Sequence, residues 1–190
     1  MKNLSFKNIC RIVPARMLKG AMSALIILAM ICNLAGCIFD NDKDDYSKVD
    51  NGAPCPAFTV RDFNGYYHTV PDETKPSLIF FFNTECCDCV RQFPIIQRLY
   101  EAYQNKIDVI GVSPCNASYK IKEFIAEHHY SFPIAEGTYK TIYDSFATAM
   151  IPRVYFVKDG IIQARNEFDN VISYDEAEGI IESLFDKTKQ

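Results

Sequence analysis

The sequence predicts an α/β fold in which a central mixed β-sheet is flanked by helices. Residues 77–82 form a continuous run of apolar β-formers, and residues 107–112 form a second, largely apolar run. Such runs are typical of strands that are buried on both faces of a sheet. Segments with the helical spacing of apolar residues follow both runs. Strands that alternate with helices in this way predict a sheet that is covered by helices.

Two short segments of β-formers, residues 58–60 and 66–70, come before the first buried strand. They bracket Asn64 and Gly65, and both of these residues tolerate the positive φ that a tight hairpin turn requires. The sequence therefore predicts an N-terminal β-hairpin extension built from two edge strands.

Four helices are expected after the hairpin, and apolar residues that recur on one helix face indicate the first three. These residues are Phe93, Ile96, Leu99, Tyr100 and Tyr103; Ile121, Phe124, Ile125 and His128; and Ile142, Tyr143 and Phe146. Next, residues 154–157 and 161–164 are expected to form two strands joined by a tight turn. Ser173 and Glu176 have the spacing of a capping box, which predicts the start of the last helix.

Length, composition and charge limit the classes of protein to consider. The 190 residues suffice for one ordinary domain. An apolar fraction of 48% and a charged fraction of 23% predict a hydrophobic core rather than a disordered chain. The formal net charge is −4, so no basic surplus is available to neutralise nucleic-acid phosphates. A nucleic-acid partner is therefore not expected.

Residues 1–36 have the pattern of a secretory signal peptide. Five basic residues and no acidic ones lie in residues 1–19, and an apolar run follows over residues 21–32. The segment ends in Leu-Ala-Gly-Cys at positions 34–37, which resembles the bacterial lipobox. The resemblance implies cleavage before Cys37 and lipidation of its thiol. An ordinary cleavage site that leaves Cys37 as a free thiol is the alternative.

The segment after Cys37 is rich in Asp and poor in apolar residues, which predicts an acidic tether over residues 37–50. The folded domain is then expected to span residues 51–190. These expectations place the protein in the bacterial cell envelope, lipid-anchored to a membrane, either on the periplasmic side or at the outer-membrane surface.

Three of the eight cysteines, Cys86, Cys87 and Cys89, fall within four positions. If Cys86 lies at the first turn of the following helix, backbone N–H groups and the helix dipole favour its thiolate, which is the nucleophile in disulfide exchange. Cys89 lies one turn further on, where it can resolve a mixed disulfide with a partner protein. A buried structural disulfide or half of a zinc site are the alternatives, although no second C-x-x-C or C-x-x-H motif completes a zinc site.

Residues 82–89 with Pro94 resemble the active-site strand, loop and kinked helix of the thioredoxin-like family. Residues 52–58 are similar to the entry segment of its TlpA/ResA-type membrane-anchored thiol-disulfide oxidoreductases. Ile151 and Pro152 stand where that family keeps a cis-proline. The resemblance implies a thioredoxin-like fold, a redox pair of Cys86 and Cys89, and no cofactor. It also implies a cis Pro152 beside the sulfurs, where a bound peptide pairs with the backbone.

The resemblance further implies protein disulfides or thiols as substrates and a thiol transporter of the inner membrane as the electron donor. Several residues near the motif depart from the family and are candidate modulators. Glu85 stands where an aromatic residue is usual, and Asp88 lies inside the motif; both charges disfavour a thiolate at Cys86, which predicts a reductase rather than a strong oxidant. Arg153 follows Pro152, and it is expected either to favour an anion or to be a solvated surface residue.

Three further cysteines lie outside the expected redox pair. Cys87 is interpreted either as a partly exposed spare thiol or as a third redox or metal-binding sulfur. Cys55 and Cys115 are expected to be small buried residues, because a free cysteine packs as a hydrophobe.

Two other functions compete with disulfide exchange. Thr84-x-x-Cys87 resembles part of a peroxiredoxin motif, and Arg153 would be the cation beside its thiolate, but Phe80 stands where that motif has a proline. A copper-binding chaperone module similar to the Sco type would use the soft sulfurs of the cluster with a histidine. Sco-type proteins space their cysteines C-x-x-x-C, and this chain does not.

Overall fold

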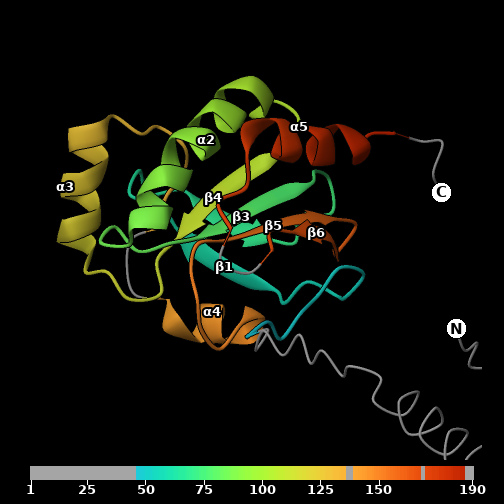
Figure 1. The fold of residues 1–190 in the computed structure, drawn as a ribbon, viewed down its shortest axis with the longest axis horizontal. Helices are drawn as coiled ribbons and strands as arrows, with labels where there is room; N and C mark the ends of the chain where they lie inside the picture. The colour runs from blue at the N-terminus through green and yellow to red at the C-terminus, as the bar shows by residue number, and fades with distance from the viewer. Residues whose placement is uncertain (1–45, 136–138, 168–169, 187–190) are drawn as a thin grey trace, which may run out of the picture. The chain divides into compact units, whose positions relative to one another are not determined.

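A mixed sheet with the strand order β4-β3-β5-β6 forms the centre of the computed structural model (Figure 1). The structure describes residues 46–135, 139–167 and 170–186, all within the unit Asp44–Gln190. The four strands are β3 (Ser77–Phe81), β4 (Asp108–Val112), β5 (Arg153–Lys158) and β6 (Ile161–Arg165). β3 runs parallel to β4 and antiparallel to β5, and β5 is antiparallel to β6. The predicted mixed sheet is confirmed.

The predicted hairpin is present as a separate antiparallel pair, β1 (Phe58–Arg61) and β2 (Tyr67–Val70). Its connection is longer than the expected two-residue turn, because Asp62 organises a loop. The buried Asp62 accepts the backbone N–H groups of Asn64 (2.9 Å) and Tyr66 (2.8 Å) through Oδ1. Gly65 adopts a φ of +91°, whereas Asn64 does not have a positive φ.

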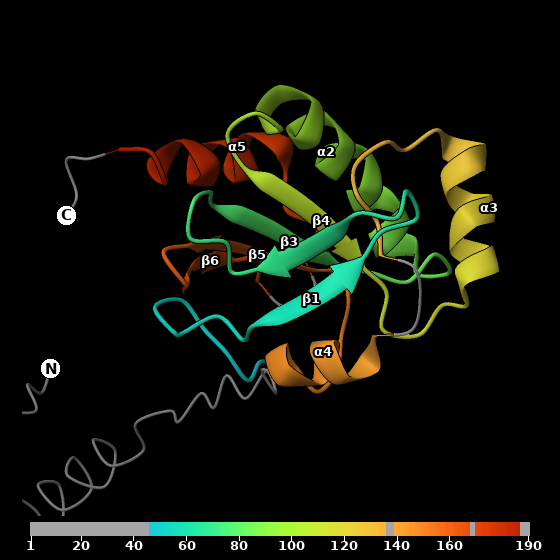
Figure 2. The same ribbon diagram turned by 180° about the vertical axis from the view of Figure 1, so that it is seen from behind.

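Helices cover both faces of the sheet, as Figures 1 and 2 show. They are α2 (Cys87–Tyr103), α3 (Ser118–His128), α4 (Lys140–Phe146) and α5 (Tyr174–Ser183). Side chains alternate along β3, so Phe80 and Phe82 join the core beneath α2 and α5, while Phe81 joins the core beneath α4 and the hairpin. Burial on both faces explains why the sequence of β3 is a continuous apolar run.

Helix α2 is held on the sheet by aromatic packing. The Phe93 ring lies 5.0 Å from the Phe80 ring and 4.8 Å from the Phe82 ring, both with edge-to-face geometry. Gln92, which precedes Phe93 and is fully buried, accepts the Ile172 N–H (2.9 Å) and donates to the Ile172 carbonyl (3.3 Å). These contacts fix the first turn of α2 beside the end of β3, where the cysteine cluster lies.

The packed part of the chain includes residues that the sequence assigned to the tether. Tyr46 and Lys48 exchange backbone hydrogen bonds with the segment 146–148, and Ser47 forms a β-bridge with Ala147. The proposed signal peptide, Cys37 and residues 37–45 lie outside the described residues. Among the described ranges, no helix is both long enough and apolar enough to cross a membrane.

Candidate active site: a dithiol at the start of helix α2

A short turn after β3 places Cys86 at the N-terminus of α2. Asn83 accepts the Glu85 N–H through Oδ1 (2.8 Å) and the Cys86 N–H through its carbonyl oxygen (3.1 Å). Cys86 is the N-cap residue, with φ −91° and ψ 120°, and its Sγ accepts the backbone N–H of Cys89 at 3.5 Å. A sulfur in this position faces the unpaired N–H groups of the first turn, which favour a negative charge there.

Cys89 occupies a different environment from Cys86. It is fully buried, whereas Cys86 is half-buried, and both are free thiols in this structure. Desolvation by burial raises the pKa of the Cys89 thiol, while the N–H of Asn83, 3.4 Å from Cys89 Sγ, acts in the opposite direction. The outer sulfur is therefore placed for attack, and the inner sulfur is kept protonated and shielded.

The segment before β5 lies against the outer sulfur. The peptide bond between Ile151 and Pro152 is cis, as the family resemblance implied. The Cys86 thiol donates to the Ile151 carbonyl oxygen at 3.7 Å. The structure thus brings together Cys86, Cys89 and Ile151, which were chosen from the sequence although the last is more than sixty positions away. Met150, beside Ile151, is 40% exposed.

Arg153 is a buried residue that contacts this segment, which contradicts one of the two sequence-based expectations. Only 4% of it is exposed, so the solvated surface position is wrong. Its guanidinium donates to the carbonyl oxygens of Ala149 (2.9 Å) and Met150 (3.1 Å), and to the Ser47 hydroxyl (2.5 Å). The Arg153 guanidinium therefore contacts the backbone that leads to Ile151 and is shielded from solvent.

The two acidic modulators have cationic partners. Glu85 pairs with Lys120 of α3 at 2.5 Å, and Asp88 pairs with Arg91 at 3.0 Å. All four side chains are substantially exposed, so each pair is screened by water. The negative charge expected around Cys86 is therefore largely balanced, and Lys120 is the partner that the sequence pattern did not indicate.

The other described cysteines fall into two groups. Cys55 is buried, as expected, and desolvation raises the pKa of its thiol to about 12. Cys87 is exposed on the first turn of α2. The expectation for Cys115 is wrong, because its side chain is exposed. Ser113 and Asn116 fill the interior of its loop, and the Cys115 sulfur accepts the side-chain N–H of Asn83 at 3.2 Å.

Sequence reasoning missed the polar residues that join the cysteine loop to the loop after β4. Asn116 is buried, accepts the Thr84 N–H (2.9 Å) and donates to Asn83 Oδ1 (3.0 Å). The partners are more than thirty positions apart, so no local pattern reveals the contact. The parallel pairing of β3 and β4, with Phe81 opposite Val112, brings these two loops to the same edge of the sheet.

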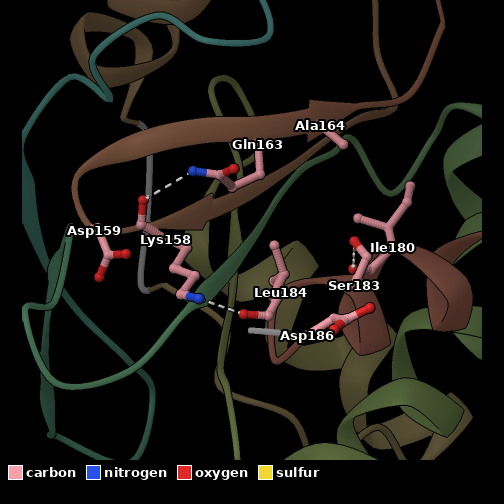
Figure 3. A pocket seen from close by; sticks show the side chains of 8 residues that line it. All are labelled: Lys158, Asp159, Gln163, Ala164, Ile180, Ser183, Leu184 and Asp186. Carbon is pink, nitrogen blue, oxygen red and sulfur yellow. Dashed lines mark hydrogen bonds between the residues drawn. The ribbon is translucent and has the colours of Figure 1, made fainter. Parts of the chain in front are cut away.

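A hollow lies at the end of β5 that is remote from Cys86. It has a volume of about 280 Å³ and lies between the β5–β6 turn and the end of α5 (Figure 3). Its cation, Lys158, already donates to the Leu184 carbonyl oxygen. No cysteine lines this hollow. Within the described ranges, no group of three or more His, Cys, Asp or Glu side chains is arranged to hold a metal ion.

The sequence is similar to those of known proteins. Residues 51–165, more than half of the chain, match the AhpC/TSA family. The chain belongs to the AhpC/TSA family. Thiol-disulfide oxidoreductase ResA from Bacillus cereus is 25% identical to it over 140 residues, which cover 72% of this chain and 81% of that protein.

Solved structures show the same fold. The thioredoxin domain of a thiol-disulfide oxidoreductase from Bacteroides vulgatus matches with a TM-score of 0.61 at 22% identity, over 70% of this chain and 99% of that one. A secreted disulfide oxidoreductase from Mycobacterium tuberculosis matches with a TM-score of 0.59 at 18% identity, over 67% and 96% of the two chains. The predicted thioredoxin-like fold is confirmed, and so is the enzyme class, a thioredoxin-like thiol-disulfide oxidoreductase.

Replacement of Arg153 tests whether its buried contacts support the fold around the site. Arg153→Met keeps much of the side-chain length but leaves the carbonyl oxygens of Ala149 and Met150 without their donor. We expect the free energy of unfolding, measured by urea denaturation, to fall by about 3 kcal/mol. The control is Arg91→Met, whose exposed ion pair predicts a change below about 0.5 kcal/mol. Equal stability of the two variants would show that Arg153 has no supporting role.

Proposed function

We propose that this protein is an extracytoplasmic, lipid-anchored thiol-disulfide oxidoreductase that reduces protein disulfides through Cys86 and Cys89. The observation that carries the proposal is the position of the Cys86 sulfur. It caps the N-terminus of α2 and lies 3.7 Å from the carbonyl oxygen of Ile151, directly before a cis-proline. A nucleophile and an adjacent strand-like backbone are the two elements that attack on a disulfide within a peptide chain requires.

The exchange proceeds in two balanced steps. The Cys86 thiolate attacks one sulfur of the substrate disulfide, forms a mixed disulfide and releases the other substrate sulfur as a thiolate. Cys89 then loses its proton and attacks Cys86 Sγ, which breaks the mixed disulfide and releases the second substrate sulfur. The substrate gains two electrons, and the enzyme is left with a Cys86–Cys89 disulfide. A thiol donor, for which an inner-membrane thiol transporter is proposed, restores the dithiol.

The order of attack predicts which variant accumulates an intermediate. Cys89→Ser retains the attacking sulfur but cannot complete the second step, so it should trap mixed disulfides with partner proteins. Non-reducing electrophoresis of alkylated extracts measures the trapped species. Cys87→Ser, which changes the exposed neighbouring thiol, should trap none and retain insulin reduction. The assignment of roles fails if Cys86→Ser traps as much as Cys89→Ser, or if Cys87→Ser alone abolishes exchange.

The direction of electron flow follows from the two sulfur environments. Strong oxidants of this fold depend on a very stable thiolate in their reduced form. Here the Cys86 sulfur receives a long 3.5 Å hydrogen bond, and burial keeps the Cys89 thiol protonated. Nearby carboxylates bring further negative charge, although Lys120 and Arg91 offset it. The reduced form is therefore not specially stabilised, which favours a reductase.

The redox potential tests this direction. We expect a midpoint closer to the ~−270 mV of thioredoxin than to the ~−120 mV of a strong periplasmic oxidase. Equilibration of Cys87→Ser protein with glutathione buffers, followed by alkylation and counting of thiols, gives the value without interference from the third sulfur of the cluster. A midpoint more oxidising than about −180 mV, typical of a disulfide isomerase, would refute the reductase assignment.

Lipid anchoring rests on the lipobox-like segment at positions 34–37 after an apolar run. One of the structurally similar proteins is secreted, in keeping with an extracytoplasmic site of action. We expect a radioactive fatty acid to label the protein through Cys37. Cys32→Ser, which changes a neighbouring thiol within the apolar run, should keep the label. Label that persists in Cys37→Ser protein would contradict the anchoring proposal.

The competing functions have less support. The peroxidase alternative would favour hydrogen bonds from the Thr84 hydroxyl or Arg153 to the Cys87 sulfur. In the described part of the chain, neither bond is present. The copper alternative needs a group of soft ligands, and the described residues offer no such group of three. Disulfide exchange therefore remains the proposed activity.

A further inference from the structure

Asn83 supplies a hydrogen bond to the buried sulfur of the proposed redox pair. Its backbone N–H lies 3.4 Å from Cys89 Sγ, and Cys89 is fully buried. This N–H counteracts the desolvation that disfavours a thiolate at Cys89. A donor aimed at a sulfur without access to water is worth most when that sulfur becomes negatively charged.

The orientation of Asn83 is set from outside the cysteine loop. Its Oδ1 accepts the Asn116 side-chain N–H at 3.0 Å, and Asn116 Oδ1 accepts the Thr84 N–H at 2.9 Å. Asn116 is itself fixed by Ser113, whose hydroxyl donates to Asn116 Oδ1 (3.1 Å) and accepts the Asn116 N–H (2.9 Å). Asn116 is 3% exposed and Ser113 is fully buried, so these bonds are sheltered from water.

We propose that Asn116 is a positioning residue for disulfide exchange, because it holds Asn83 so that its backbone N–H points at the sulfur that leaves when the enzyme is reduced. This inference rests on the proposed Cys86–Cys89 pair and adds a part that the cysteine motif does not contain. The hydrogen bonds of Asn116 to Asn83 and Thr84 join the two loops that follow the parallel strands β3 and β4. Asn116 acts through Asn83 and does not touch a reacting atom.

The step concerned is the reduction of the enzyme disulfide. A donor thiolate attacks Cys86 Sγ, a bond forms between the donor sulfur and Cys86, and the Cys86–Cys89 bond breaks. Its electron pair passes to Cys89 Sγ, which leaves as a thiolate and takes up the proton that the second donor thiol loses in the next step. The second thiol of the donor then attacks the donor sulfur that is bonded to Cys86. The bond to Cys86 breaks, and the donor becomes a disulfide. The Asn83 N–H stabilises the charge that develops on Cys89.

The test measures the rate at which dithiothreitol reduces the disulfide of the full-length chain in a Cys87→Ser background. Trypsin does not cleave after Lys75, because a proline follows it, so residues 62–91 are released as one peptide that contains both Cys86 and Cys89. Mass spectrometry of this peptide after alkylation therefore follows this cysteine pair alone. Asn116→Asp keeps the acceptor for Thr84 but places an oxygen opposite Asn83 Oδ1. We expect reduction to slow by about tenfold, as loss of alignment to a charged acceptor predicts.

A matched control is Asp62→Ala, which also removes a buried acceptor of two backbone N–H groups, but in the hairpin loop. It should leave the rate within about twofold of the parent. In a Cys86→Ser protein, Ser113→Ala, which adds no charge, should also move the alkylation profile of Cys89 to higher pH, which a general loss of stability would not do. If Asn116→Asp does not fold, Ser113→Ala removes one support of Asn116 and should slow reduction in the same direction.

The outcomes separate the two proposals. A rate unchanged by a folded Asn116 or Ser113 variant, or an equal slowing in Asp62→Ala, overturns the role of Asn116 alone. Failure to trap protein partners with Cys89→Ser overturns the proposed function but leaves the dithiothreitol measurement intact. If oxidation yields no disulfide between Cys86 and Cys89, both proposals are overturned.

Discussion

The contact between the Phe93 ring and the rings of Phe80 and Phe82 is the constraint on which the site depends. It joins the one helix that begins with the cysteine cluster to the central strand of the sheet. With α2 fixed there, the chain has only the few residues after Phe81 in which to turn, and Cys86 becomes the cap of the helix. Apolar packing thus determines the position of a sulfur that makes few contacts of its own, and the reactive end of α2 remains half-exposed because the buried part of the helix carries the packing.

Polar contacts complete the arrangement where apolar packing ends. Each of the two segments that flank the sulfurs is held by a buried polar side chain: Asn116, more than thirty positions away, holds the turn before α2, and Arg153 holds the nearby segment before Pro152. In the described residues, every buried side-chain nitrogen and oxygen has a hydrogen-bond partner. Such satisfied networks cost little stability and define one geometry, which suits a site in which a substrate sulfur must approach along one line.

The sequence predicts the helices and strands well, but it does not predict the polar contacts that hold the site. Periodicity along the chain reports which face of a strand or helix is buried, so β3, α2 and the hairpin follow from local pattern. The position of Cys86 at a helix start is equally local. By contrast, the pairing of Lys120 with Glu85 and the burial of Arg153 depend on residues brought together by the sheet. The exposure of Cys115 has the same origin, because Asn116, which bonds to Thr84 and Asn83 in the loop after β3, takes the interior position of the loop that contains Cys115.

The pairing of Tyr46 and Lys48 with residues 146–148 has a mechanical consequence. The first described residues of the chain also brace the segment that leads to Ile151, since Ser47 accepts a hydrogen bond from Arg153. A pulling force applied from the N-terminal side is borne first by this contact, before it reaches the central strands. The first described residues and the segment that leads to Ile151 therefore belong to one hydrogen-bonded piece of structure, so a displacement of one is transmitted to the other.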